Sequence, residues 1–205
     1  SGTLTFEFGS FAGGIFTAMN LSLHGTEYQK QHFLKPFMRG EIRFPISMSE
    51  PNAGSDVANV QTRAERDGDD YVLNGQKLWC SGAGNPGAVI LMLVRTARTE
   101  DKRKGLSILI VPNDLSGMTI RTLQTLARRS ITTTEIFLDN VRVPAANMLG
   151  APGAGFEIIA GEHLALAWHR LPEALNVEQR IARLTAWVLA AERTARPFSL
   201  TAPGI

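Results

Sequence analysis

Two polar segments of this 205-residue chain carry the residue types best suited to chemistry. Residues 49–56, Ser-Glu-Pro-Asn-Ala-Gly-Ser-Asp, follow a predicted strand, and turns of this composition expose hydroxyl and backbone N–H groups to an anion or a heterocycle. Further along, Trp79 and Ser81 are two positions apart, which in a strand puts the ring and the hydroxyl on one face. A stacking ring opposite a set of donors is the type of site that holds an isoalloxazine ring, although periodicity alone does not name the flavin.

Each of these residues also has a purely structural interpretation. Trp79 could belong to the core of a β-barrel, and the hydroxyls of Ser55 and Ser81 could serve turns. We expect Glu50 to be a structural or capping carboxylate in preference to a catalytic base.

Several other chemistries lack their sequence patterns. The glycine-rich residues 150–155 match neither G-x-G-x-x-G nor a P-loop, and they favour a loop at a helix start over a phosphate site. The chain has no G-x-S-x-G motif, and no histidine lies near Cys80 in a nucleophile signature. The histidines have no paired-ligand spacing, so we expect no metal site; they are His24, His32, His163 and His169.

Composition narrows the class of protein. Lys and Arg number 21 against 19 Asp and Glu, and the formal net charge of +2 argues against a nucleic-acid partner. The single cysteine excludes an internal disulfide framework and fits a reducing compartment. The longest apolar run, residues 88–94, is far shorter than the ~20 residues of a membrane helix, so we expect no membrane segment. No basic segment precedes the apolar residues 8–23, so they do not resemble a signal peptide, and the start at Ser1 indicates a processed chain or a piece of a longer one.

Residues 10–40 carry the signals of two helices. Thr26 and Gln29 form a capping-box pattern for the second helix. We expect Gly40 to end that helix and Pro36 to kink its last turn or begin a separate one. The first helix has an apolar stripe at Ile15, Met19 and Leu23.

From residue 43 the apolar period changes to two, which predicts antiparallel strands. Asn74-Gly75 predicts a type I′ hairpin turn within residues 71–79, because both turn positions need a positive φ. The charged residues 98–104 are expected to form a solvated turn. The predicted strands are 43–49, 57–66, 70–80, 87–95, 105–111, 117–124 and 132–143.

After Pro144 the helical period returns, first in residues 155–169 and then in an apolar stripe over 177–191 that Pro197 ends. This order of elements predicts an α+β fold, an antiparallel β-barrel or sandwich flanked by helices. The expected domains are 1–42, the end of an N-terminal helical domain; 43–150, a middle β-domain; and 151–205, the start of a C-terminal helical domain.

Several phrases, in this order, closely resemble the acyl-CoA dehydrogenases. They are residues 24–30, 49–56, the Asn-Gly-Gln-Lys-Leu-Trp-Cys-Ser-Gly of 74–82, 129–133 before Phe137, the Asp-Asn-Val-Arg-Val-Pro of 139–144, and 153–156. The resemblance runs from about residue 20 to 165. It implies an FAD-dependent enzyme fold, here without part of the N-terminal and most of the C-terminal helical domain.

The resemblance also implies a set of cofactor contacts. Met48 and Ser49 would lie along the flavin pyrimidine, with the Ser49 N–H and hydroxyl donating to the ring. Ser55 would reach the pyrophosphate of FAD or the phosphates of an acyl-CoA substrate. Trp79 would pack on the flavin, and Ser81 would donate to N5, the atom that receives hydride. Arg129 would have a structural or cofactor-contacting role, the alternative being a surface cation paired with a neighbour such as Glu135.

The implied reaction is the oxidation of an acyl-CoA thioester to the 2,3-enoyl-CoA. A carboxylate takes the α-proton, the β-hydrogen leaves as hydride to FAD, and an electron-transferring flavoprotein reoxidises the cofactor. The catalytic residue is unknown here: the family's usual glutamate lies in the C-terminal region, and its alternative position matches residues 164–170, which contain no carboxylate. Glu162, about one turn earlier, is only a weak candidate.

The resemblance further implies a homo-oligomer, dimer or tetramer, that acts in fatty acid β-oxidation in a bacterial cytoplasm or a mitochondrial matrix. Two alternatives stay open. One is a flavin monooxygenase or oxidase of the same fold. The other is a non-catalytic module that binds flavin or a partner chain.

Overall fold

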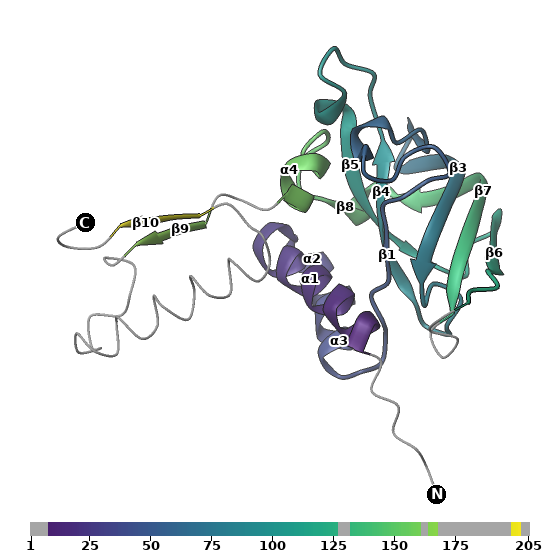
Figure 1. The fold of residues 1–205 in the computed structure, drawn as a ribbon, viewed down its shortest axis with the longest axis horizontal. Helices are drawn as coiled ribbons and strands as arrows, with labels where there is room; N and C mark the ends of the chain where they lie inside the picture. The colour runs from purple at the N-terminus through teal and green to yellow at the C-terminus, as the bar shows by residue number, and fades with distance from the viewer. Residues whose placement is uncertain (1–7, 127–131, 161–163, 168–197, 202–205) are drawn as a thin grey trace, which may run out of the picture. The chain divides into compact units, whose positions relative to one another are not determined.

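A computed structural model describes residues 8–126, 132–160, 164–167 and 198–201. The chain divides into two compact units, Ser1–Phe156 and Glu157–Ile205. In the first unit, helices lie beside an eight-stranded sheet (Figure 1), which confirms the α+β class. In the second, strands β9 (Leu164–Ala167) and β10 (Phe198–Thr201) pair in parallel.

The helical signals of residues 10–40 are confirmed. Thr26 Oγ accepts the Gln29 N–H at 3.2 Å, and Gln29 Oε1 accepts the Thr26 N–H at 3.1 Å, which completes the capping box. Pro36 lies in the first turn of the third helix, and Gly40, with φ +74°, follows its end. The elements are α1 (Phe8–His24), α2 (Glu27–Gln29), a π-helical turn (Lys30–Leu34) and α3 (Lys35–Met38).

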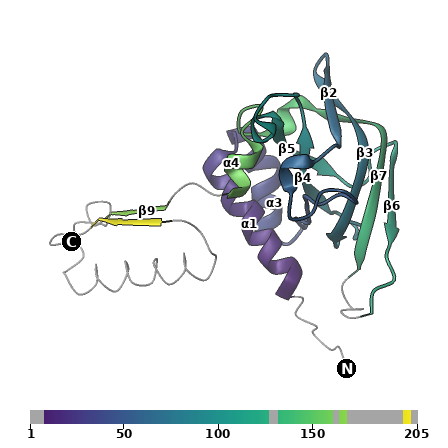
Figure 2. The ribbon, with the colours of Figure 1, turned by 45° about the horizontal axis from the view of Figure 1, so that its top comes forward.

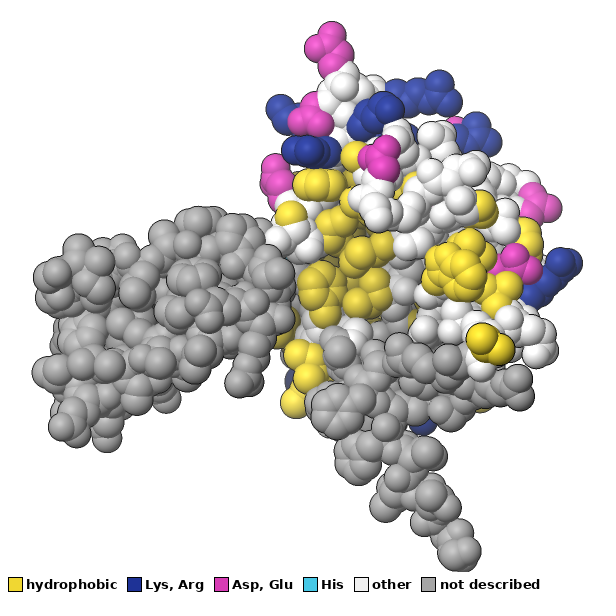
Figure 3. All heavy atoms as spheres, in the orientation of Figure 1, with side chains coloured by type: hydrophobic (Ala, Val, Ile, Leu, Met, Phe, Trp, Pro, Cys, Tyr) yellow, Lys and Arg dark blue, Asp and Glu magenta, His cyan; other side chains and the backbone are white. Residues whose placement is uncertain are grey.

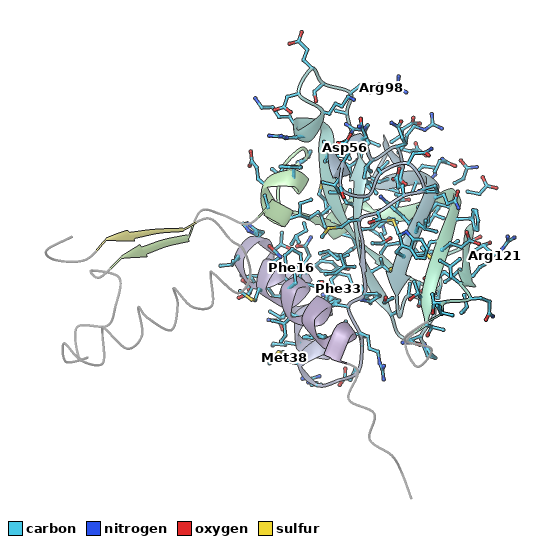
Figure 4. The ribbon with its side chains drawn as sticks, in the orientation of Figure 1. Phe16, Phe33, Met38, Asp56, Arg98 and Arg121 are labelled. Carbon is cyan, nitrogen blue, oxygen red and sulfur yellow. The ribbon has the colours of Figure 1, made fainter. Side chains whose placement is uncertain are left out.

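The face of α1 that packs inside the unit is not its apolar stripe. Thr17, Asn20 and Leu21 are buried, whereas the stripe of Ile15, Met19 and Leu23 is 41–67% exposed. Figure 4 shows Phe16 among the helices, Phe33 on their side toward the strands, and Met38 at their outer edge. Gly14 has no side chain to keep the Phe37 ring away, which lets α1 approach α3 closely.

The sheet runs in the order β6-β7-β3-β2-β4-β5-β8, and β1 pairs with β4. Most neighbours are antiparallel as predicted, but β1 pairs in parallel with β4, and β2 meets β4 in parallel at one position. Side chains from its strands form the core, which includes Leu73, Cys80, Met92, Leu109 and Ile136. The strands are β1 (Ile46–Ser47), β2 (Arg63–Asp67), β3 (Asp70–Ser81), β4 (Val89–Arg95), β5 (Leu106–Pro112), β6 (Met118–Thr122), β7 (Thr133–Pro144) and β8 (Met148–Leu149).

The hairpin prediction at Asn74-Gly75 is wrong. The turn lies at Gly68, with φ +60°, and joins β2 to β3 in the projecting hairpin of Figure 2. Strand β3 continues through Gly75, because it pairs with β7 on both sides of this position. Opposite Gly75, β7 has one extra residue, which forms a bulge. A Cβ on Gly75 would lie 2.7 Å from Thr62 Oγ, so the glycine serves close packing.

Three other expectations need correction. Residues 57–66 are not one strand: a 3₁₀ turn (Val57–Asn59) precedes β2. The predicted strand 43–49 contains only the two residues of β1. The predicted helix 155–169 is shorter, because α4 (Gly155–Ala160) is followed by β9, whose hydrogen-bonding partner β10 is remote in sequence. The stripe at 177–191 lies outside the described residues.

Candidate functional site

Residues 49–56, which we call the cradle loop, lie directly beside the end of β3. The Leu78 N–H donates to the Ser49 carbonyl at 2.9 Å. Cys80 Sγ donates to the Ile46 carbonyl at 3.2 Å, three residues before the loop. The cradle loop and the residues around Trp79 and Ser81 therefore converge, as the sequence predicts.

Trp79 is held in an unusual backbone conformation. Between Lys77 and Cys80, β3 has an extra residue relative to β7, and Trp79 adopts φ +64° in this bulge. The left-handed region costs a bulky residue of order 1–3 kcal/mol, so the surrounding contacts must maintain it. Trp79 is 58% exposed, while the neighbouring Cys80 is fully buried. Trp79 is thus not part of the core; its ring faces the surface.

Three hydroxyl groups at the site have no partner within the described part of the chain. Ser49, Ser55 and Ser81 make no side-chain hydrogen bond there. Ser49 and Ser81 are half-buried and Ser55 is exposed, and Met48 beside Ser49 is also half-buried. Hydroxyl donors on two adjoining segments, one of which carries an exposed tryptophan, are compatible with a flat heterocycle that has hydrogen-bond acceptors, such as a flavin.

Glu50 forms a buried ion pair. Its Oε1 lies 2.9 Å from Lys77 Nζ, and the two side chains are 5% and 0% exposed. Glu50 also accepts the N–H groups of Gln61 at 2.6 Å and Thr62 at 2.9 Å. The expectation that Glu50 is structural is confirmed.

The pKa values of this cluster follow from burial and charge. Burial acts to raise the pKa of Glu50, but Lys77 and the hydrogen bonds from Thr62 and Gln61 outweigh it, so the pKa lies below its usual value. Burial lowers the pKa of Lys77 to about 8, although Glu50 opposes this change. Burial raises the pKa of the Cys80 thiol to about 12, so the thiol stays protonated and is no nucleophile.

A second feature lies next to the cradle loop. A cavity of about 330 Å³ is lined by Asn59, Gln61, Arg95, Arg98, Thr99 and Lys102. Figure 3 shows charged side chains gathered at this end of the molecule, and Figure 4 shows Arg98 and Asp56 there. The sequence assigned residues 98–104 to a solvated turn and gave no signal for a cavity, since residues 59 and 61 approach them only in the fold.

The three basic side chains that line this cavity make different interactions. Arg95 donates to the carbonyls of Val60 at 2.8 Å and Ala58 at 2.7 Å, and so fixes the chain after the cradle loop to β4. Lys102 Nζ donates to Asn59 Oδ1 at 2.6 Å. Arg98 makes no hydrogen bond or ion pair within the described residues, so its charge is available to an anion.

Other expected site residues lie outside the described part. These are Arg129 and Glu162. The described residues contain no cluster of three or more metal-ligating side chains. No described helix is both long and apolar enough to cross a membrane.

Comparisons with known proteins point to one family. Residues 46–141 match the family model "Acyl-CoA dehydrogenase, middle domain". The probable acyl-CoA dehydrogenase YngJ of Bacillus subtilis is 43% identical over 141 residues, 68% of this chain and 37% of YngJ. Among solved structures, the glutaryl-coenzyme A dehydrogenase complex with glutaryl-CoA matches with TM-score 0.67 and 33% identity over 71% of this chain and 37% of its own. The prolyl acyl carrier protein oxidase AnaB matches with TM-score 0.69 and 29% identity over 74% and 40%.

The chain thus spans less than half the length of these relatives. The matched residues include β1, the cradle loop, the whole of β3 and most of β7, which are the elements that build the site. The chain belongs to the acyl-CoA dehydrogenase family, and the match to the family's middle-domain model covers residues 46–141.

Proposed function

We propose that the cradle loop and the end of β3 bind FAD as part of an acyl-CoA dehydrogenase, which oxidises an acyl-CoA thioester to the 2,3-enoyl-CoA. The observation that carries this proposal is the pairing of an exposed, conformationally restrained Trp79 with unpaired Ser49 and Ser81 hydroxyls. A bound aromatic heterocycle would cover the ring and use the donors.

Four residues of the two segments would contact the flavin ring. Met48 and Ser49 would hold the pyrimidine side of the ring, and the Ser49 N–H and hydroxyl would donate to its acceptors. Trp79 would pack against the ring, and Ser81 would offer its hydroxyl to N5. Because Ser49 is tied to Leu78 through its carbonyl, the donors on the two segments keep a fixed separation.

The anionic parts of the ligands fit the region after the cradle loop. Ser55 would donate to the FAD pyrophosphate or to the phosphates of the CoA substrate. Arg98 and Lys102 in the adjacent cavity add positive charge that attracts phosphate groups.

The chemistry then divides between cofactor and chain. FAD, when bound, supplies the hydride acceptor. The residues of this chain orient the ring and exclude water from one of its faces. Glu50 is not the base, because both of its oxygens are held by buried donors. The base stays unassigned, with Glu162 as a weak candidate.

The absorption spectrum of the purified chain tests the proposal. We expect flavin bands near one FAD per chain after reconstitution, and Trp79→Ala and Ser81→Ala variants that retain less FAD. Met38→Ala, at an exposed position on α3, serves as the control. Anaerobic bleaching of bound FAD by a panel of acyl-CoAs then tests the substrate class. A chain that folds and binds no FAD contradicts the proposal.

The similarity to AnaB supports a second candidate, an oxidase that acts on a thioester and passes electrons to oxygen. Oxygen uptake with a thioester substrate identifies this activity, whereas reduction of an electron-transferring flavoprotein identifies the dehydrogenase. A chain that retains FAD with neither activity fits a non-catalytic flavin-binding module.

The proposed partners are an acyl-CoA, an electron-transferring flavoprotein and a second copy of the chain. The exposed stripe of α1 supports association, because contiguous apolar surface favours contact with another protein face. Sedimentation of the purified chain measures this directly. We place the protein in a reducing compartment, bacterial cytoplasm or mitochondrial matrix, which fits its one buried, unpaired cysteine.

A further inference from the structure

The ion pair between Glu50 and Lys77 has no place in the proposed chemistry, yet it is fully enclosed. Lys77 is among the largest fully buried side chains of the described residues. Removing two charges from water is costly, and a well-packed apolar pair of the same volume is often equally stable. Stability alone therefore does not account for the pair.

The hydrogen bonds of the pair lead to the start of the cradle loop and to the chain before β2. Lys77 Nζ donates to the Met48 carbonyl at 3.3 Å as well as to Glu50. Glu50 in turn holds the N–H groups of Gln61 and Thr62, which lie just before β2. The pair thus joins three segments: the start of the cradle loop, the chain before β2, and β3.

In the sequence, Glu50 and Lys77 lie within two positions of residues proposed to contact the flavin. Glu50 follows Ser49, and Lys77 precedes the bulge that contains Trp79. A non-glycine residue keeps φ near +64° only where its surroundings determine the backbone on both sides. Lys77 fixes the bulge on one side, and Cys80, bonded to the Ile46 carbonyl, fixes it on the other.

We propose that Glu50 and Lys77 are a positioning pair that fixes the cradle loop against β3, and thereby sets where the Trp79 ring and the Ser49 donors meet the flavin. Both side chains are buried, so they act through the segments that they hold and not through contact with the ligand. The identity of the ligand rests on the proposed function, whereas the effect on Trp79 does not.

The test removes the charges and nearly keeps the volume. The variant Glu50→Gln/Lys77→Met offers one acceptor to two backbone N–H groups and leaves the Met48 carbonyl without its donor. It is made in a Trp168→Phe/Trp187→Phe background, where Trp79 is the only tryptophan. The matched control is Glu27→Gln/Lys30→Met, the same substitutions at an exposed pair 3.2 Å apart.

Two quantities are measured in each variant: acrylamide quenching of Trp79 without FAD, and the Kd of FAD. For the buried pair we expect the quenching constant to change by about twofold and the Kd to rise by about tenfold, in a chain that still unfolds cooperatively but at a lower urea midpoint, because the Met48 carbonyl loses its donor. For the exposed pair we expect the parental values. A folded buried-pair variant with parental quenching overturns the proposal.

The experiment separates a failure of the proposed function from a failure of the positioning role of Glu50 and Lys77. If the parent binds no FAD, the proposed function fails, and the quenching of Trp79 still decides the role of the pair. If the buried-pair variant does not fold, hydrogen exchange of the parent decides. The amides of Gln61, Thr62 and Leu78 should then exchange as slowly as the amide of Leu73 in the core. Exchange about 100-fold faster than that of Leu73 overturns the proposal that Glu50 and Lys77 are a positioning pair.

Discussion

Replacing Trp79 by glycine and by alanine separates the ring's role from that of its backbone. Both substitutions remove the ring, but only glycine adopts φ +64° without strain. With 42% of a side chain of ~200 Å² buried, the loss of packing costs ~2 kcal/mol in either variant. Relief of the left-handed strain returns ~1–2 kcal/mol in the glycine variant alone, against ~0.5–1 kcal/mol of added backbone entropy in the unfolded chain. We therefore expect Trp79→Gly to be more stable than Trp79→Ala by up to ~1.5 kcal/mol.

The effect on cofactor binding should be equal in the two variants. The exposed 58% of the ring amounts to ~115 Å², and covering it contributes up to ~3 kcal/mol, or roughly a 100-fold change in Kd. Urea unfolding gives the stability order, and flavin fluorescence gives the Kd. If alanine proves as stable as glycine, the inference from the backbone angle is refuted. If FAD binds both variants as it binds the parent, the ring does not contact the flavin.

The remaining predictions concern packing, pH and the basic cavity. Gly75→Ala should destabilise the chain by ~1–3 kcal/mol in urea unfolding, since the new Cβ meets Thr62 at 2.7 Å. The pKa of Lys77 is about 8 in the folded chain and near 10.5 in the unfolded chain, so between pH 8 and 10.5 the unfolded state binds more protons. The free energy of unfolding of the parent should therefore rise with pH across this window, and that of Lys77→Met should not. Arg98→Ala should leave the urea midpoint unchanged and weaken acyl-CoA binding in calorimetry, whereas Arg95→Met should lower the midpoint, because it strands carbonyls that the guanidinium now satisfies.

Local signals in the sequence identified the features that depend on neighbouring residues. The capping box at Thr26 and Gln29 and the end of the helix at Gly40 depend on backbone groups within one or two turns, so their residue types sufficed. The phrases around the cradle loop and β3 indicated the family, which the comparisons confirm, and the two segments that form the candidate site. Alternating apolar residues located most strands, because one face of each strand packs into the core.

The tertiary structure decided what depends on distant partners. Asn74-Gly75 has the composition of a tight turn, yet pairing with β7 keeps β3 continuous, and the turn moves to Gly68. The apolar period of α1 did not reveal which face packs, because Gly14 and Phe37 meet only after folding. The bulge at Trp79, the burial of Lys77 against Glu50 and the cavity at Arg98 have the same origin: each joins residues far apart in sequence, so no local pattern encodes it.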